Sequence, residues 1–524
     1  MLNRILLLIA GAIAAVTSFA FAENSSEPSQ EKTGYFQFGL DFNLGFNGGP
    51  TDPTFAIDTA ERYGGPKSNW RGLRIPLETA RSYEESVEPF FMFAFRAGYK
   101  DFHFLLEAPL RKDLEAWYSS DLKTNFTYKP SELDINVPIN AYAKWYNPVG
   151  FVQFGRFDSE NLKISKNDIF LGGLPYHDGI HWKFNVGIFR YDFLLSSLNA
   201  WLFGDVIDNE TGCPEDENSE AYVQKCTPRS KQVSNQRNRT YTENVKNMVF
   251  HRLGIETNKF WFFLVEQSVI GGKSLEFRSF NPFMYWHDNY STGYTSAATS
   301  FELGYKTSNG AKFYTQLNFE DFASPVGESK EKGTTRTIVN YMVGYYHELE
   351  TRKYGLFSWR LEVVRTDPVA NNSRLPLLKY TGRRNYRSNY REQSDKDYAD
   401  ALFVDYPIGY RRGGDALDLW FDMNWKWNRH AAKLTLAWLR QGDKELYTDY
   451  DVALKSENSL SGVVEKQFLV DVLYEREVYD WFKLYAGGGF RVYRNLAHDK
   501  NEDGADAWIR SGVKFSFNPV DKKF

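Results

Sequence analysis

Residues Tyr35 to Phe46 read YFQFGLDFNLGF, and this stretch decides the fold class. Every even position is apolar, whereas the odd positions hold tyrosine, glycine or polar residues. A side-chain period of two predicts a β-strand with one apolar and one polar face. The stretch exceeds the usual strand of about five or six residues and suits the roughly nine to eleven residues that a tilted strand needs to cross a bilayer. We therefore expect a transmembrane strand with lipid on one side and a wet lumen on the other. A long strand in a soluble sheet is the alternative.

The same alternation recurs along the chain and predicts about eighteen strands. No strand of the barrel is assigned to residues 47–88. The predicted strands are 35–46, 89–98, 102–110, 133–145, 149–157, 180–189, 193–203, 248–257, 260–270, 299–306, 312–320, 338–347, 357–365, 417–427, 433–439, 468–475, 482–493 and 507–517.

The connections between these strands alternate between short turns and long loops. Asn258-Lys259 and Asn428-Arg429 are short turns, and Asn309-Gly310 is the signature of a type I′ hairpin. The segments 204–244 and 367–414 are long loops. Outer-membrane barrels sort their connections in this way, with an even number of strands, whereas a soluble sandwich does not. The sequence thus predicts an all-β fold over residues 35–524, a transmembrane antiparallel β-barrel of about 18 strands with long extracellular loops and short periplasmic turns.

The overall composition agrees with a barrel and argues against a nucleic-acid partner. The chain has 524 residues and a formal net charge of -4, whereas a nucleic-acid-binding domain is usually basic. Aromatic residues make up 17% of the chain. The mean hydropathy is nevertheless -0.52. Alternating strands with aromatic girdles combine these two properties. The partners expected of such a surface are outer-membrane lipid and lipopolysaccharide.

The first 22 residues have the features of a secretory signal peptide. Arg4 supplies the positive charge, residues 5–19 supply the apolar core, and Ala20-Phe21-Ala22 is a small-x-small cleavage site. A membrane anchor helix is the alternative. No apolar run of about eighteen residues follows, so an exported chain would reach the outer membrane as a closed barrel, after a short periplasmic segment at residues 23–34.

The two cysteines and the histidines point to no metal or catalytic centre. Cys213 and Cys226 lie in a polar loop without a nearby histidine, so we expect a disulfide rather than a metal site. His251 and His287 have no identifiable serine partner, and we predict neither an enzyme nor a cofactor. Gly487-Gly488-Gly489 lies within a strand, where small residues relieve crowding or bend the strand rather than cradle phosphate.

Several short motifs carry a resemblance to a known family. His251-Arg252 lies on one strand, and Glu266 lies on the next strand, before Gly271-Gly272. Asn281-Pro282 follows in a loop, and residues 407–415 read PIGYRRGGD. With these motifs the chain resembles the Wzi-like capsule-assembly family of outer-membrane barrels, loosely, from about residue 155 onward. Residues 47–88 depart from the family, because they show no clear helical bundle.

The resemblance implies attachment or assembly of extracellular polysaccharide by a lectin-like, non-enzymatic barrel. Sugars stack on aromatic faces and bind polar side chains, and acidic sugars bind arginine. The arginines could instead bridge lipopolysaccharide phosphates or simply be solvated. The candidate polysaccharide-binding residues are Trp286, His287, Asp288, Asn289, Arg383, Arg384, Tyr386, Arg387, Arg411 and Arg412.

Charged residues on the predicted strands are expected to face the lumen. Facing charges can pair into a network that closes the lumen or sets its ion preference, or they can merely neutralise one another. A porin for passive diffusion of small solutes is therefore the alternative function, and a structural or adhesive surface barrel without a ligand is a third. The predicted lumen charges are Arg252, Glu256, Glu266, Arg360 and Glu362.

Overall fold

The computed structural model describes residues 34–48, 73–74, 77–119, 123–134, 139–199, 245–271, 275, 295–320, 337–373, 378–387, 402–444, 446, 448, 450–456 and 460–523. The predicted signal peptide and the predicted disulfide between Cys213 and Cys226 lie outside these residues.

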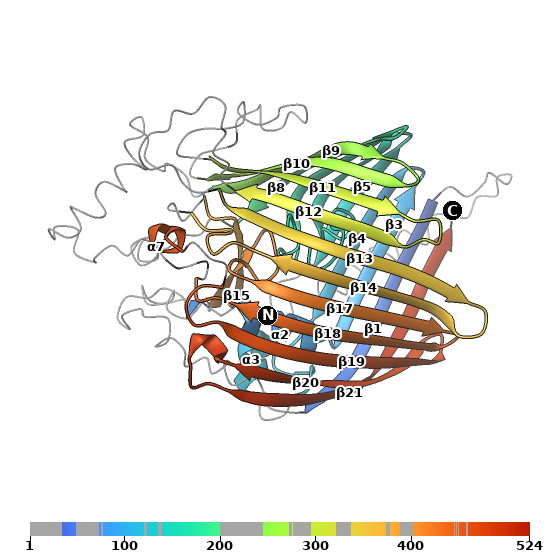
Figure 1. Ribbon diagram of the computed structural model, residues 1–524. Coiled ribbons are helices and arrows are strands. Elements are labelled where there is room, and N and C mark those ends of the chain that lie inside the picture. The colour runs from blue at the N-terminus through green and yellow to red at the C-terminus, as the bar shows by residue number, and fades with distance from the viewer. Residues whose placement is uncertain are drawn as a thin grey trace, which may run out of the picture.

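Within the described ranges, eighteen strands form one antiparallel sheet that closes on itself (Figure 1). Each strand pairs with the next barrel strand along the chain, and the first strand pairs with both the second and the last, so the sheet has no free edge. The predicted barrel and its strand number are confirmed. The strands are β1 (Gly34–Gly48), β3 (Phe91–Tyr99), β4 (Phe102–Leu110), β5 (Asn140–Asn147), β6 (Gly150–Phe157), β7 (His177–Val186), β8 (Phe189–Leu198), β9 (Lys246–Glu256), β10 (Phe260–Gly271), β11 (Thr295–Lys306), β12 (Lys312–Glu320), β13 (Val339–Thr351), β14 (Gly355–Arg365), β17 (Leu417–Trp427), β18 (His430–Gln441), β19 (Glu465–Tyr479), β20 (Phe482–Arg494) and β21 (Gly504–Lys523).

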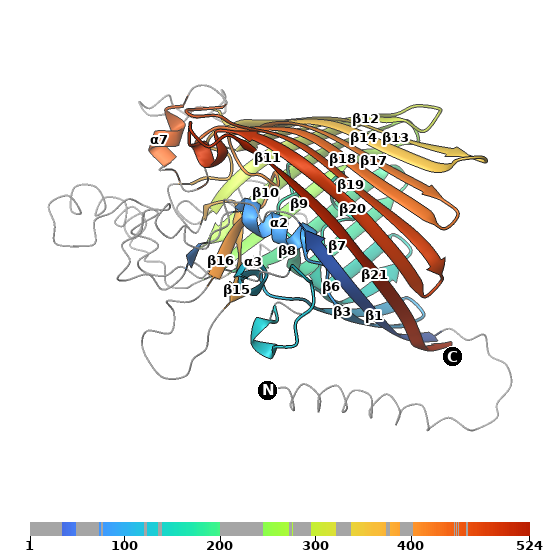
Figure 2. The ribbon, with the colours of Figure 1, turned by 90° about the horizontal axis from the view of Figure 1, so that it is seen from below.

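The remaining elements gather at the end of the barrel that carries the long connections (Figures 1 and 2). A small sheet contains β15 and β16, which are antiparallel, and β2, which pairs parallel to β16. None of the helices among the described residues is long and apolar enough to span a membrane. These elements are β2 (Leu73–Arg74), α2 (Leu77–Ser86), α3 (Leu114–Ser119), η3 (Pro130–Glu132), β15 (Thr381–Arg387), β16 (Leu402–Pro407), α7 (Tyr450–Leu454) and η7 (Leu496–His498).

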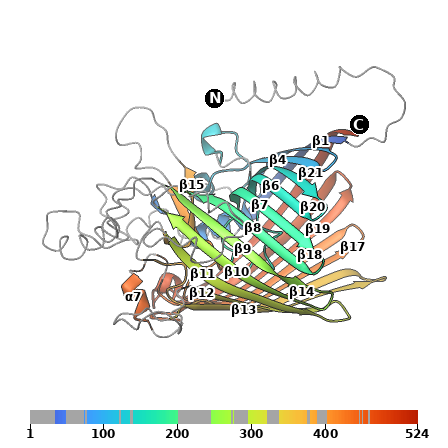
Figure 3. The ribbon, with the colours of Figure 1, turned by 90° about the horizontal axis from the view of Figure 1, so that it is seen from above.

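The outward face of the barrel is apolar and carries aromatic residues near the short turns. Tyr99, Phe102 and Phe189 flank short turns and are 54%, 60% and 60% exposed. Trp145 and Trp427 occupy equivalent positions at the ends of β5 and β17. Aromatic girdles of this kind mark the level at which a barrel meets the membrane surface. The short turns lie together at the end of the barrel opposite the long connections (Figure 3). The fold therefore points to the bacterial outer membrane, in which the short turns of a barrel face the periplasm.

Three details differ from the sequence predictions. β8 begins at Phe189 rather than at residue 193, because Gly187 adopts a left-handed conformation (φ 56°) and turns the chain early. β5 begins at Asn140 rather than at residue 133, since the 3-10 turn η3 precedes Leu133, which makes only an isolated bridge to Lys112. The turn at residues 309–310 has a positive φ at Gly310 alone, so it is not the predicted type I′ turn, which requires two.

Loop segments fill the outer part of the lumen with a packed core. We call residues 77–87, 158–174, 378–387 and 402–416 the plug. The apolar side chains of the plug are buried against inward-facing residues of the wall, such as Phe250 and Met342. The helix α2 thus lies inside the ring of strands (Figure 2). It falls within residues 47–88, for which no helix was predicted. Buried plug residues in this core include Ala80, Tyr83, Leu162, Ile169, Phe170, Leu171, Tyr380, Val404, Tyr406 and Ile408.

Candidate functional site

The amphipathic pattern of α2 explains how it docks in the barrel. Ala80, Tyr83 and Val87 recur at helical spacing on one face and are fully buried. The Tyr83 hydroxyl donates a hydrogen bond of 2.6 Å to the carbonyl oxygen of Lys112, and burial raises its pKa well above the usual value. Glu78 lies in the first turn, where the helix dipole favours a negative charge. The helix therefore buries an apolar stripe, and its acidic residues contact other segments of the plug.

Three arginines hold the acidic side chains of α2. Arg384 donates to Glu84 at 2.5 Å and also lies 3.4 Å from Asp134. Arg412 lies 3.1 Å from Glu78.

The third pair joins Arg411 to Glu85. Partial desolvation by the surrounding plug by itself raises the pKa of Glu85, but the Arg411 guanidinium outweighs that effect and holds the pKa below the usual value. All three arginines belong to the set predicted to bind polysaccharide, and here they connect the helix to β15 and to the segment after β16.

The other predicted binding residues occupy different surroundings. Arg383 forms a two-pronged ion pair with Asp405 across the small sheet, with Nε and Nη2 at 2.7 and 2.6 Å from the carboxylate oxygens, and both residues are buried. Tyr386 and Arg387 lie in β15. Trp286, His287, Asp288 and Asn289 lie outside the described residues. Arg383 and Arg384 thus stabilise the inside of the plug. A glycan could bind them only by displacing Asp405 from Arg383 or Glu84 from Arg384.

The predicted lumen charges divide between the two faces of the wall. Arg252 faces inward and lies 3.3 Å from Asp192 and 2.8 Å from Glu302. Glu256, Arg360 and Glu362 also face inward. Glu256 pairs with Lys306 at 2.6 Å. Glu362 accepts a hydrogen bond of 2.7 Å from the side-chain amide of Asn167 in the plug, and Arg360 lies 3.9 Å from Glu362.

The prediction for Glu266 needs correction, because this residue faces outward. Its neighbour Val265 belongs to the core inside the barrel, and Gln267 donates a hydrogen bond to the carbonyl oxygen of Phe170 in the plug, so Glu266 points away from the lumen. It lies opposite His251, which Tyr191 contacts at 2.8 Å. Glu266 is only 1% exposed there, so polarity alone did not reveal which face it occupies.

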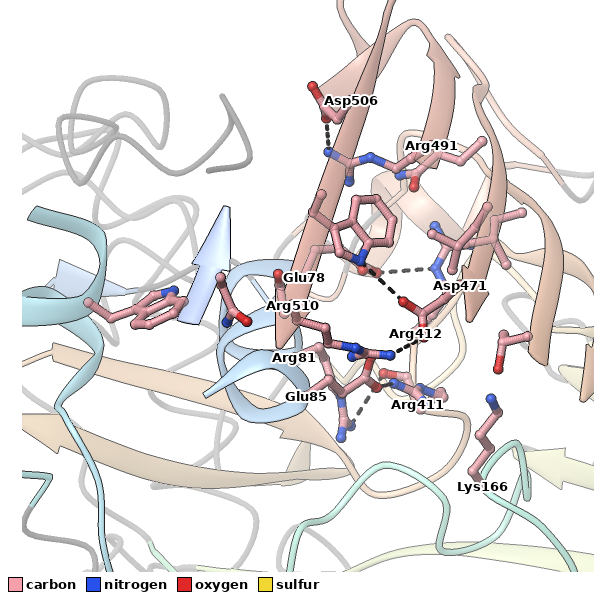
Figure 4. Close-up of a pocket in the computed structure, with 18 of the residues that line it drawn as sticks. Glu78, Arg81, Glu85, Lys166, Arg411, Arg412, Asp471, Arg491, Asp506 and Arg510 are labelled. Carbon is pink, nitrogen blue, oxygen red and sulfur yellow. Dashed lines mark hydrogen bonds and ion pairs between the residues drawn. The ribbon is translucent and has the colours of Figure 1, made fainter. Parts of the chain in front are cut away.

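A cleft of about 400 Å³ separates the plug from the wall formed by β17 to β21 (Figure 4). Its lining begins at the outer ends of the strands, at Gly48 and Asp506, and descends to the middle of the wall at Thr435 and Asp471. The cleft therefore faces the end that carries the long loops, which is the extracellular end of an outer-membrane barrel. The lining residues are Asn47, Gly48, Glu78, Arg81, Ser82, Glu85, Trp117, Tyr118, Lys123, Lys166, Arg411, Arg412, Trp420, Thr435, Leu439, Gln467, Leu469, Asp471, Arg491, Asp506, Trp508 and Arg510.

The wall side of the cleft carries an indole that is fixed in place. Trp508 donates its Nε1–H to Asp471 at 3.1 Å, and its six-membered ring lies against Gly489. A Cβ atom at Gly489 would come within 2.5 Å of the Trp508 ring and 2.3 Å of the Val470 carbonyl oxygen. The glycine run in β20 thus relieves crowding, as predicted, and lets the indole lie against the strand with part of its surface exposed to the cleft.

The plug side and the base of the cleft combine cations with a second indole. Lys166 donates to Asp422 at 2.7 Å and lies 4.8 Å from the ring centre of Trp420. The Arg411 guanidinium lies 5.6 Å from the same ring. Trp420 donates its Nε1–H to the Tyr410 hydroxyl at 2.9 Å, so this ring is also held by hydrogen bonds. A ligand in the cleft would meet charged groups and aromatic surface together.

Sequence reasoning missed most of this site. It found Arg411 and Arg412, but it gave no role to α2, Lys166 or Trp508. A signal was present in β21, where Asp506, Trp508 and Arg510 alternate on the inward face.

The cleft offers hydrogen-bond donors and acceptors, cations and aromatic surface, which are binding groups. Among the residues that the structure describes, no group of three or more histidine, cysteine, aspartate or glutamate side chains could hold a metal ion. The chemistry that these side chains support directly is therefore recognition of a polar, ring-containing ligand.

Comparisons with known proteins find distant barrels. No family model matches the sequence, and no curated protein shows significant similarity to it. Among solved structures, Wzi of Escherichia coli, described as a carbohydrate-binding β-barrel involved in group 1 capsule assembly, is 11% identical with a TM-score of 0.47, covering 92% of this chain and 84% of Wzi.

Two further structures show similarity of the same kind. OccD3 of Pseudomonas aeruginosa is 7% identical with a TM-score of 0.40, over 94% of this chain and 96% of that one. OmpT, an outer membrane protein of Vibrio cholerae, is 10% identical with a TM-score of 0.33, over 94% and 100%. Such similarity carries no information on function, so the functional argument rests on the cleft.

Proposed function

We propose that this barrel binds saccharide at the cell surface through the cleft and thereby attaches, or helps to assemble, extracellular capsular polysaccharide without catalysing a reaction. The observation that carries the proposal is Trp508, an indole held by Gly489 and Asp471 and partly exposed in a cleft of about 400 Å³ at the outer end of the barrel. A fixed aromatic face with hydrogen-bonding groups around it is what a sugar ring requires. In this proposal the outer wall contacts outer-membrane lipid and lipopolysaccharide.

The packing of the plug supports a binding role over a wide pore. The segment 158–174 is tied to the wall by Asp168, which accepts a hydrogen bond from the Gln316 side chain at 2.7 Å, and by Gln316, which accepts one from the backbone amide of Ile169 at 3.0 Å. Burial raises the pKa of Asp168 above the usual value. A lumen filled by such contacts suits a surface attachment protein.

One observation favours a second candidate, passive diffusion of small solutes. The cleft follows the wall along β17 to β21 from Gly48 at the rim to Thr435 at mid-height, which is the outer half of a path through the barrel. Conductance of the purified protein in planar bilayers separates the two functions. A silent protein agrees with the binding role, whereas steady, open conductance would make diffusion the better description.

The binding role itself is tested with the polysaccharide extracted from the surface of the native bacterium. Trp508→Ala is expected to weaken binding at least about five-fold, because an aromatic stacking face contributes about 1 kcal/mol or more. Trp481→Ala is the matched control, since Trp481 lies at the periplasmic turn between β19 and β20 and is 46% exposed. Equal affinities of the two variants, or no binding by the unaltered protein, would contradict the proposal.

A further inference from the structure

The lining of the cleft carries more positive than negative charge. Seven basic side chains and four acidic ones face it. They form two groups, one on the wall strands β19 to β21 and one on the plug (Figure 4). The wall group is Asp471, Arg491, Asp506 and Arg510, and the plug group is Glu78, Arg81, Glu85, Arg411 and Arg412, with Lys123 and Lys166 beside them.

Each acidic side chain of the lining already holds an arginine of the lining. Arg491 lies 2.6 Å from Asp506, and Arg510 contacts Asp471. On the plug, Glu78 and Glu85 hold Arg412 and Arg411, and their side chains are 46% and 60% exposed. A carboxylate on a ligand offers an arginine the same bonds as these aspartates and glutamates, so it can replace them without leaving the guanidinium unpaired.

Two arginines of the cleft, Arg510 and Arg81, do not use their full hydrogen-bonding capacity. A guanidinium can grip a carboxylate with Nε and Nη together, as Arg383 does with Asp405. Arg510 contacts Asp471 through Nη2, and its buried Nε–H has no hydrogen-bond partner among the described residues. Across the cleft, Arg81 contacts the carbonyl oxygens of Gly173 and Arg411 through Nη2, and its Nε is likewise buried without a partner in that part of the chain.

Unsatisfied buried donors are rare in native proteins, and each calls for an explanation. We infer that the ligand of the cleft is an acidic saccharide whose carboxylates take the place of Asp471 and Asp506 on Arg510 and Arg491. This inference rests on the proposed function and adds the charge of the ligand. In the exchanged state the ligand carboxylate occupies both arms of the Arg510 fork, the sugar ring lies on Trp508, and the aspartates turn toward solvent in the cleft.

The test uses the full-length protein in detergent and two probes of equal size. One probe is the trisaccharide of galacturonic acid, and the other is its neutral counterpart with the carboxylates reduced to alcohols. Calorimetry at low salt is expected to show at least ten-fold tighter binding of the acidic probe. Since the attraction is between opposite charges, this preference should shrink as salt is added.

Charge variants test the exchange itself. Asp506→Asn and Asp471→Asn remove the internal competitors, so each is expected to raise the affinity for the acidic probe relative to the neutral probe at least three-fold. Arg510→Met is expected to weaken binding of the acidic probe at least ten-fold. Two different aspartate variants are used because one of them could unfold locally, and retention of the folded barrel is checked by its resistance to unfolding in dodecyl sulfate before heating.

The outcomes separate the inference from the proposed function. Equal binding of both probes would leave a saccharide-binding barrel and overturn the acidic ligand. Binding of neither probe would overturn both. Competition by inorganic phosphate at the concentration of the acidic probe would show a site for any anion and overturn recognition of a saccharide. Weaker rather than tighter binding by both aspartate variants would refute the exchange.

Discussion

The ion pair between Arg384 and Glu84 is expected to dominate the docking of α2, and two neighbouring alanine substitutions can show it. The Arg384 and Glu84 side chains are 8% and 16% exposed, and Asp134 beside them is 4% exposed. Removing one partner of a buried pair costs about 3–5 kcal/mol, because the other charge stays buried. We expect the lower end, about 3 kcal/mol, for Glu84→Ala, since Glu84 retains some contact with solvent and Arg384 keeps Asp134 at 3.4 Å.

The matched control is Glu85→Ala, one position further along the same helix. Glu85 is 60% exposed, whereas its partner Arg411 is 12% exposed and lines the cleft. Water in the cleft can therefore replace the lost carboxylate, and we expect a cost of only about 0–1 kcal/mol. The gain in helix propensity is the same at both positions and cancels in the comparison.

Amide hydrogen exchange in α2 measures the two effects directly. A loss of 3 kcal/mol accelerates exchange about 100-fold or more, whereas the control should change it less than about five-fold. Similar exchange rates in the two variants would refute the reasoning, because they would mean that burial of the pair does not decide its contribution.

Three further changes test other parts of the structure. Burial lowers the pKa of Lys163 to about 8, although Asp168 opposes the shift. Between about pH 8 and 10.5 the unfolded chain therefore binds more protons than the folded protein, and the free energy of unfolding rises with pH by about 3 kcal/mol. Chemical unfolding measures this rise, and Lys163→Met should abolish it. Gly489→Ala forces a Cβ against the Trp508 ring and should cost about 1–3 kcal/mol, with a shifted fluorescence spectrum. Asp168→Ala removes one acceptor of the Gln316 amide and the side-chain acceptor of the Phe170 and Leu171 backbone amides, and the plug should become sensitive to protease while the barrel stays folded. Unchanged values in any of these measurements would contradict the corresponding contact.

The barrel could be predicted because the two faces of each strand meet different surroundings, and successive residues of the strand alternate between those faces. The alternation in Tyr35 to Phe46 reports lipid on one side and the lumen on the other, and no distant residue is needed to interpret it. Strand ends were less predictable, since Gly187 decides the start of β8 through its backbone conformation rather than its polarity. Glu266 shows the limit of polarity as a guide, because a charged residue can be buried on the outer face of a wall.

The site was less predictable because its residues meet only in three dimensions. Arg384 and Glu84 are 300 positions apart, and neither segment contains a sequence pattern that predicts contact with the other. The arginines after Asp367 resemble a solvent-facing basic surface in the sequence, yet Arg383 and Arg384 are buried. Trp508 was more accessible to prediction, because it alternates with Asp506 and Arg510 on an inward face that the strand pattern defines.

The construction of the plug from separate loops has a consequence for the order of folding. The parallel pairing of β16 with β2 joins Leu402 to Leu73, and α2 meets its arginines only after the strands between them have been placed. Contacts this distant along the chain form slowly, because the entropy of closing the loop is lost before they stabilise anything. We therefore expect refolding in two kinetic phases, in which the barrel wall forms first and the plug packs second. Protease added early in refolding would cut at α2 while the strand signal is already present, and protection of α2 would arrive last.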